Sequence, residues 1–318
     1  MKVTDHIKNG KGSTQFTFEI LPPLKGQDIK SVFDSIDPLM EFKPPFIDVT
    51  YHREEYNYIE KDNGLLEKRV IRKRPGTVGI CAAIQNRYQV DAIPHILCGG
   101  FSQEDTENFL IDLDFLGIDN LVALRGDAVK SETYFKPTKG GHVYAKDLVV
   151  QINNLNRGQY LDEEILNSTP TDFCIGVAGY PEKHAEAPSL DSDIQFLKKK
   201  IEAGSHYIIT QMFFDNQKFF EFEEKCREGG INVPIIPGLK PLATLKQLNM
   251  IPHRFHVDLP QDLINEVQKA KDNTAVSEIG VDWCIQQSKE LKNHGVPFLH
   301  YYSMGKSKNV KKIASSIF

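Results

Sequence analysis

The sequence has few cysteines, and their spacing excludes two classes of protein. Only five occur in 318 residues, and no two of them form a C-x-x-C pair. An odd number of scattered cysteines argues against a disulfide framework and against a zinc site. We therefore expect reduced, mostly buried thiols at these positions, which are Cys81, Cys98, Cys174, Cys226 and Cys284.

Long apolar runs and an excess of basic charge are also absent. No run approaches the roughly 18 to 20 apolar residues that a membrane span needs, and the N-terminus has no apolar signal segment. The net charge of −5 argues against a nucleic-acid surface as the main function. We therefore expect a cytoplasmic protein with no nucleic-acid or membrane partner. We also expect it to be a homo-oligomer that acts on small molecules.

Several catalytic motifs are missing. The first predicted strand ends at Pro22-Pro23 where a Rossmann site would have a Gly-x-Gly-x-x-Gly turn. The chain contains no Gly-x-Ser-x-Gly for a serine nucleophile and no His-Glu-x-x-His for a metal. None of the predicted strands ends in a lysine, which disfavours a Schiff-base aldolase.

Strand and helix patterns alternate along the chain. Phe16, Phe18 and Ile20 alternate with Thr17 and Glu19, which is the period of a strand. Apolar residues at spacings of three and four predict the intervening helices. Strands are predicted at 16–21, 46–50, 92–97, 120–124, 173–178, 207–211, 233–237 and 298–302. Helices are predicted at 28–42, 77–88, 103–115, 144–157, 190–203 and 216–228, with helical segments over 241–293 interrupted around Pro252 and Pro260.

This alternation predicts an α/β fold, a closed (β/α)8 TIM barrel in a single domain. Parallel strands need helical crossovers, and eight of them suit a barrel of this length. A doubly wound open sheet is the alternative. We expect residues 1–15 to form a flexible or peripheral N-terminal lead-in, 16–318 to form the barrel, and 51–74 to be a long loop with some helix.

Polar residues collect where the predicted strands end. In such barrels the working residues lie at the C-terminal ends of the strands. Taken alone, Glu19 at a strand end is typical of a solvated charge. The full set of strand ends is Glu19, Thr50 to His52, His95, Arg125 to Asp127, Tyr180 with His184, Gln211, Gly238 and Tyr302. A metal site of His95, Asp127 and His184 is conceivable but lacks any close ligand spacing, so we expect no metal.

These motifs together resemble a known family. The residues are Phe18-Glu19-Ile20-Leu21-Pro22-Pro23, Val49-Thr50-Tyr51, Pro94-His95, Ala123-Leu124-Arg125-Gly126-Asp127, Tyr180-Pro181-Glu182-Lys183-His184, Thr210-Gln211-Met212-Phe213-Phe214-Asp215 and Pro237-Gly238. In this order, over about residues 16 to 305, they are similar to 5,10-methylenetetrahydrofolate reductase. The resemblance implies a (β/α)8 barrel holding FAD. The chain resembles the compact bacterial form without a C-terminal regulatory domain.

The resemblance also implies the reaction and the roles of the residues. NADH or NADPH would reduce FAD, which would pass hydride to 5,10-methylenetetrahydrofolate in a ping-pong cycle. Glu19 matches the catalytic acid, Asp127 matches the aspartate that holds the pterin and tunes the flavin, and Gln211 matches a substrate contact, as does Tyr302. The implied cofactor-binding residues are Thr50, His95, Leu124, Arg125, Gly126, Asp127, Tyr144, Ala145, Ala178, Tyr180, His184, Asp193, Lys200 and Tyr302.

A few positions depart from the family pattern. His52-Arg53 and Leu97 bear on the flavin contacts, while Met212 and Leu245 bear on how nicotinamide and folate stack. The choice between NADH and NADPH therefore stays open, with NADH favoured. Two alternatives remain for the function, a non-catalytic flavin- or folate-binding barrel subunit and a flavin-free barrel lyase.

Overall fold

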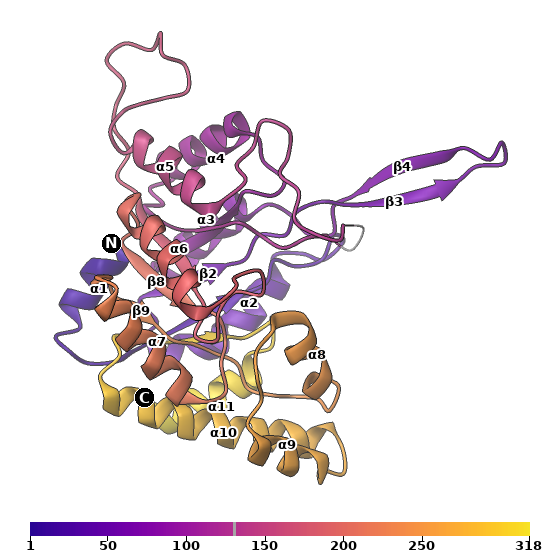
Figure 1. Cartoon of the computed structure of the whole chain (residues 1–318), viewed down its shortest axis with the longest axis vertical. Coiled ribbons are helices and arrows are strands. Elements are labelled where there is room, and N and C mark those ends of the chain that lie inside the picture. The colour runs from indigo at the N-terminus through magenta and orange to yellow at the C-terminus, as the bar shows by residue number, and fades with distance from the viewer. Residues whose placement is uncertain (130–131) are drawn as a thin grey trace.

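A nearly closed barrel of parallel strands forms the centre of the molecule (Figure 1). The computed structural model describes residues 1–129 and 132–318. The barrel strands are β1 (Gln15–Ile20), β2 (Phe46–Val49), β5 (Asp91–Leu97), β6 (Asn120–Leu124), β7 (Cys174–Gly179), β8 (Tyr207–Thr210), β9 (Ile235–Ile236), β10 (Gly238–Leu239) and β11 (Phe298–Tyr302). They pair in the order β10-β11-β1-β2-β5-β6-β7-β8-β9, and every pairing is parallel.

The prediction of a (β/α)8 barrel is confirmed, although the seventh strand is divided. β9 pairs with β8 and β10 pairs with β11, and only Pro237 separates the two pieces. Proline has no N–H to donate to a ladder, so the strand is interrupted there. The carbonyl of Pro237 still accepts a hydrogen bond from the His300 N–H at 3.1 Å, which helps to close the barrel.

Helices surround the strands (Figure 1). They are α2 (Lys30–Ile36), α3 (Thr77–Tyr88), α4 (Gln103–Phe115), α5 (Ala145–Leu155), α6 (Leu190–Glu202), α7 (Asn216–Glu228), α8 (Gln247–Phe255), α9 (Gln261–Gln268), α10 (Asn273–His294) and α11 (Ser307–Ile317), with the 3-10 helix η1 (Asp37–Phe42) after α2. The predicted helix 28–42 is therefore two elements. Pro252 lies inside α8 rather than in an irregular patch, and Pro260 is the N-cap of α9.

The first residues form a short helix at one end of the barrel. They form α1 (Val3–Asn9), and the side chain of Val3 is buried. The Val3 N–H donates to Oδ1 of Asn120 at 2.9 Å, and the N-terminal ammonium pairs with Asp91 at 2.8 Å. Both partners lie at the starts of their strands, so α1 covers the N-terminal end of the barrel.

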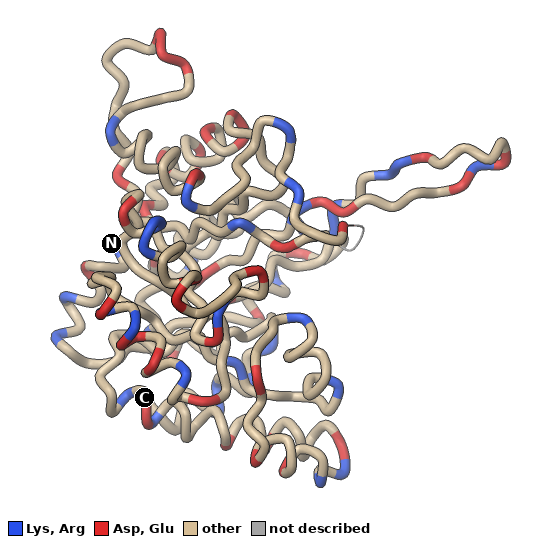
Figure 2. The backbone as a smooth tube through the Cα atoms, in the orientation of Figure 1, with Lys and Arg blue, Asp and Glu red and all other residues tan. Residues whose placement is uncertain are grey.

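The loop expected at 51–74 is mostly a β-hairpin. β3 (Glu55–Glu60) pairs antiparallel with β4 (Leu66–Ile71), and the hairpin projects away from the barrel (Figure 1). Charges of both signs lie along it (Figure 2). The prediction of some helix there was wrong because the alternation of Tyr56, Tyr58 and Val70 with polar residues is the period of a strand.

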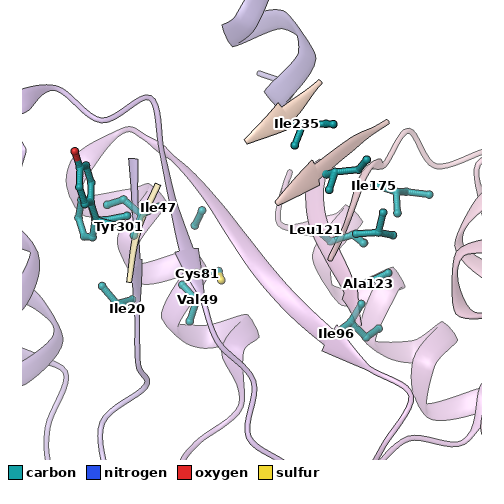
Figure 3. Close-up of a cluster of buried hydrophobic side chains, with 14 of the residues drawn as sticks. Ile20, Ile47, Val49, Cys81, Ile96, Leu121, Ala123, Ile175, Ile235 and Tyr301 are labelled. Atoms are coloured by element: carbon teal, nitrogen blue, oxygen red, sulfur yellow. The ribbon is translucent and has the colours of Figure 1, made fainter. Parts of the chain in front are cut away.

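Two apolar layers hold the barrel together. The outward side chains of the strands pack against the helices, and Figure 3 labels ten residues of this cluster. A second cluster, which includes Val3, Phe46, Ile93 and Tyr207, contains the inward strand residues nearest α1. All five cysteines are buried and free, as predicted. None of the helices described is long and apolar enough to cross a membrane.

Candidate active site

Glu19 points into the barrel near its C-terminal end. Phe16, Phe18 and Ile20 of β1 pack in the outer cluster, so the alternate residues Thr17 and Glu19 face inward. The strand register pairs Glu19 with Asp48 of β2 on one side and with Tyr302 of β11 on the other. Only 8% of Glu19 is exposed, so it is not the solvated charge that a lone strand-end glutamate would be.

His95 joins Glu19 to a second buried carboxylate. Its Nε2 lies 3.8 Å from Oε2 of Glu19 and 3.3 Å from Oδ2 of Asp48. Burial opposes the charged imidazole, but the hydrogen bond to Asp48 and the charge of Glu19 raise the pKa of His95 above its usual value. The other oxygen of Asp48, Oδ1, is buried with no hydrogen-bond partner among the described residues. Sequence reasoning missed Asp48, although it shares the inward face of β2 with Phe46 and alternates with the outward Ile47 and Val49.

Glu19 keeps its proton near neutral pH. Burial raises the pKa of its carboxyl to about 7, with His95 opposing the shift, Asp48 adding to it and Lys240 opposing it. Asp127, which we expected to supply the neighbouring negative charge, is not among the groups that shift it; the like charge is Asp48. A carboxyl group with this pKa can donate a proton at pH 7.

Lys240 corrects the expectation that no strand ends in a lysine. The divided seventh strand continues through β10 (Gly238–Leu239), and Lys240 follows it directly. Lys240 is buried, with 8% of its surface exposed. Burial lowers the pKa of its ammonium to about 8, although Glu19 opposes that shift. The strand was predicted to end at Pro237, so no local pattern placed this lysine at a strand end.

Tyr302 and Gln211 lie on neighbouring parts of the same rim. The Tyr302 hydroxyl donates to the carbonyl of Thr210 at 2.5 Å, which links β11 to the end of β8 across the split strand. Gln211 follows β8, and its side-chain oxygen accepts a hydrogen bond from the Met212 N–H at 3.0 Å. Both residues therefore have fixed positions close to the level of Glu19.

The turn after β6 carries a cation and an exposed carboxylate. Arg125 forms a two-pronged ion pair with Glu186, at 2.6 and 2.7 Å. Gly126 has a φ of +85°, and a Cβ there would lie 3.2 Å from Leu97. Asp127 is exposed, unlike Glu19. Burial raises the pKa of the Tyr180 hydroxyl, and the nearby charge of Asp127 adds to this shift.

The end of β7, the loop after it and α6 bring together five of the predicted residues. The Tyr180 and His184 rings pack edge to face with centroids 4.9 Å apart, and the His184 N–H donates to Asp193 at 2.8 Å. The Lys200 ammonium donates to the carbonyl of Ala178 at 2.6 Å. Burial lowers the pKa of Lys200 to about 8, while Asp193 opposes the shift.

The other predicted residues lie farther from Glu19 or make local contacts. Thr50 donates to the carbonyl of Ile20 at 3.3 Å, and Leu124 packs on the inner cluster. Tyr144 is an exposed N-cap without a side-chain capping bond, and Ala145 is the first residue of α5. The N–H groups of the first turn of α5 are suited to an anion.

The departures from the family pattern lie in different surroundings. Arg53 pairs with Glu132, and its guanidinium lies 5.7 Å from the Phe135 ring, so it anchors residues 132–135 near the end of β2. Met212 is buried in an apolar cluster with Phe214 and Leu242, whereas Leu245 is half exposed. Met212 therefore has a packing role, and Leu245 is free to contact a ligand.

No metal-binding group is present among the residues that the structure describes. Glu19 lines neither of two surface pockets. One is lined by Ile7, Gly12, His294 and neighbours at the opposite end of the barrel, and the other by Lys246, Met250 and Arg254 on α8. The titratable side chains that meet inside the barrel are Glu19, His95, Asp48 and Lys240.

Comparisons with known proteins identify the family. A family model described as methylenetetrahydrofolate reductase matches residues 2–317. The 5,10-methylenetetrahydrofolate reductase of Escherichia coli is 30% identical over 93% of this chain and 88% of its own length. An Arabidopsis thaliana methylenetetrahydrofolate reductase (NADH) is 32% identical over the whole of this chain and 50% of its own. The chain thus spans about half the length of its plant and fission yeast relatives.

A solved structure supports the fold. A Clostridium thermocellum protein that binds two copies of 5-methyl-5,6,7,8-tetrahydrofolic acid superposes with a TM-score of 0.62, covering 99% of this chain and 98% of its own at 16% identity. At that identity the likeness concerns the barrel alone. The match of the family model and the bacterial relative go further, and they show that this chain belongs to the methylenetetrahydrofolate reductase family.

Proposed function

We propose that the protein is an FAD-dependent methylenetetrahydrofolate reductase, which reduces 5,10-methylenetetrahydrofolate to 5-methyltetrahydrofolate with NAD(P)H. The observation that carries this proposal is Glu19, a buried carboxyl group that holds its proton to about pH 7 at the C-terminal end of the barrel. Membership of the family supports the choice of substrate. NADH is the favoured donor, although relatives named for NADH and for NADPH both occur.

The ends of β6 and β7 fit an anionic dinucleotide. Arg125 and Lys200 offer charge-assisted donors for phosphate oxygens, and the first turn of α5 offers N–H groups. The fork of Arg125 is taken by Glu186, whose side chain is 56% exposed, and a diphosphate can replace this carboxylate. When bound, FAD supplies the relay of hydride from the nicotinamide to the folate.

Glu19 has a task in only one half of the reaction. Opening the imidazolidine ring of the folate expels an amine nitrogen that must be protonated as the bond breaks. Reduction of the cofactor by NAD(P)H releases no such leaving group. Since one barrel mouth has to admit both substrates in turn, we expect ping-pong kinetics.

The test measures the two half-reactions separately in Glu19→Gln. The purified protein should show a flavin absorbance spectrum. NAD(P)H should reduce the variant at a near-normal rate, and reoxidation by methylenetetrahydrofolate should slow by at least about 10²-fold, a typical contribution of a positioned acid. Stopped-flow absorbance records both rates.

Two results would overturn the proposal. Protein that contains no flavin and binds none on reconstitution would exclude the reductase. Equal damage to both half-reactions would make Glu19 a structural carboxylate instead of the acid. Glu224→Gln, which changes an exposed glutamate on α7, is the matched control and should leave both rates unchanged.

A further inference from the structure

We propose that Lys240 is the counter-charge of Glu19: its ammonium balances the carboxylate that forms when Glu19 gives up its proton. This inference rests on the proposed function and adds a residue that the family motifs do not contain. It makes Lys240 a positioning residue, because it acts on the substrate through Glu19.

The strand register places Lys240 at the level of Glu19. β10 pairs with β11, with Gly238 opposite His300 and Leu239 opposite Tyr301, so Lys240 comes level with Tyr302. Tyr302 on β11 is itself the register partner of Glu19 on β1. A Cβ at Gly238 would lie 2.4 Å from the Tyr302 hydroxyl, so Gly238 faces inward, and Lys240 two residues later lies on the same face.

Lys240 lacks a partner that would explain its burial as structural. Lysine is almost never fully buried unless it is paired. Lys240 nevertheless forms no hydrogen bond or close ion pair with any residue that the structure describes. The nearby carboxylates at this level are Glu19 and Asp48, and Asp48 is already bonded to His95. Glu19 is therefore the charge that the ammonium can balance.

The charges around Glu19 support this pairing. Asp48 reaches it from β2, His95 from β5, Lys240 from β10 and the neutral Tyr302 from β11. When His95 is protonated, it balances Asp48. With Glu19 protonated, the site then carries the single positive charge of Lys240, and with Glu19 ionised the site is neutral. Proton release thus removes an unbalanced buried charge, which favours the release.

The step balances without any change in Lys240. The carbon–nitrogen bond of the folate ring breaks with its electron pair left on nitrogen, and that nitrogen takes the proton from the Glu19 carboxyl. Lys240 keeps its three protons and faces a new carboxylate. Its pKa of about 8, lowered by burial, raised by Glu19 and lowered by Lys306, keeps most of the lysine charged at pH 7.

The first test follows the pH dependence of folate reduction in Lys240→Met. The rate of reoxidation by methylenetetrahydrofolate should fall as pH rises through the pKa of Glu19. Loss of the ammonium should shift this fall in rate to higher pH by about one unit, because the Glu19 carboxylate loses its opposite charge. Reduction by NAD(P)H should not change. Lys240→Arg, which keeps the charge, should keep the limb in place, and Lys289→Met, which changes an exposed lysine on α10, is the matched control.

The second test needs neither flavin nor folate. In flavin-free protein labelled with 13C at the ε-carbon of lysine, the signal missing in Lys240→Met identifies Lys240. Glu19→Gln should lower the pKa of that signal by about one unit, because coupling between two sites is reciprocal. The pKa of a lysine with a purely structural role would not change in Glu19→Gln.

The outcomes separate this inference from the proposed function. If the protein fails to reduce methylenetetrahydrofolate while Glu19→Gln still shifts the Lys240 signal, the reductase is wrong and the charge pair stands. If catalysis proceeds but neither the falling limb nor the lysine signal moves, Lys240 is not the counter-charge. If Lys240→Met does not fold, Lys240→Arg and the Glu19→Gln titration still decide between these results.

Discussion

Two carboxylates at the barrel mouth have opposite surroundings. Glu19 is buried, and this burial holds its proton, whereas Asp127 is exposed on the turn after β6. Arg125 and Tyr180 lie within electrostatic reach of Asp127. Water around Asp127 keeps the cost of its negative charge low, so it suits a lasting charge better than a proton donor.

For Asp127 we predict an effect on the flavin potential. A negative charge beside the bound flavin opposes the charge that reduction adds, so Asp127→Asn should raise the midpoint potential on the order of 30 mV and slow folate turnover. A redox titration of the purified variant measures the potential. Asp62→Asn, in the turn of the hairpin, is the control, and an unchanged potential in Asp127→Asn would remove the tuning role.

At the scale of elements, the β3–β4 hairpin differs from the rest of the fold. Its cross-strand pairs place Tyr56, Tyr58, Leu66 and Val70 on one face, and all four are exposed. The other face carries its own ion pairs, such as Lys61 with Glu67. β3 and β4 pack mainly on each other, so the hairpin adds little to the barrel.

Removing the hairpin should therefore leave the barrel stable. Replacing residues 56–70 by an Asn-Gly turn joins the paired residues Glu55 and Ile71 directly. We expect the free energy of unfolding, measured by urea denaturation, to change by less than about 1 kcal/mol, as for other surface changes.

Deleting residues 1–9 gives a loss of stability with which removal of the hairpin can be compared. That deletion removes α1, the burial of Val3 and the hydrogen bond to Asn120. It should cost about 3 kcal/mol or more, since a buried side chain and a buried hydrogen bond are both lost. An equal loss on removal of the hairpin would show that the hairpin supports the barrel.

At the scale of the whole molecule, Glu182 connects distant segments. It lies in the loop after β7, and its Oε2 accepts a hydrogen bond from the Asp258 N–H between α8 and α9 at 2.9 Å. Its other oxygen is buried without a partner among the described residues. Burial raises the pKa of Glu182 to about 7, with the Asp258 N–H opposing the shift.

This raised pKa predicts how stability depends on pH. Between about pH 4.5 and 7 the folded protein holds a proton on Glu182 that the unfolded chain releases. The contribution of this group to stability is therefore complete below pH 4.5 and declines as pH rises to 7. Glu19, also raised to about 7, acts in the same direction.

Glu182→Gln should weaken that decline. The amide oxygen can still accept from Asp258 and carries no charge, so the loss of unfolding free energy between pH 5 and pH 8 should shrink by about 1 kcal/mol. Urea denaturation at the two pH values measures it. The unfolding free energy of the exposed control Glu224→Gln should decline with pH as that of the parent does. An equal decline in Glu182→Gln would show that the Glu182 carboxyl group of the parent is already ionised at pH 5.

The barrel could be predicted from the sequence because its signals are local. The alternation in 16–21 and the unbroken apolar run in 120–124 each reflect the faces that one strand buries, and the repeated strand–helix pattern requires parallel pairing. The same reasoning placed Glu19 and His95 at strand ends, where the structure brings their side chains within 3.8 Å of each other.

The tertiary structure decided what depends on partners distant in the chain. Asp48 and His95 meet because β2 and β5 are adjacent, and Lys240 reaches the level of Glu19 because the seventh strand continues past Pro237. The pKa of Glu19 follows from these neighbours and from burial. A periodic pattern reports which face of a strand is buried, but the charges that meet inside a closed barrel are set by strand order and register.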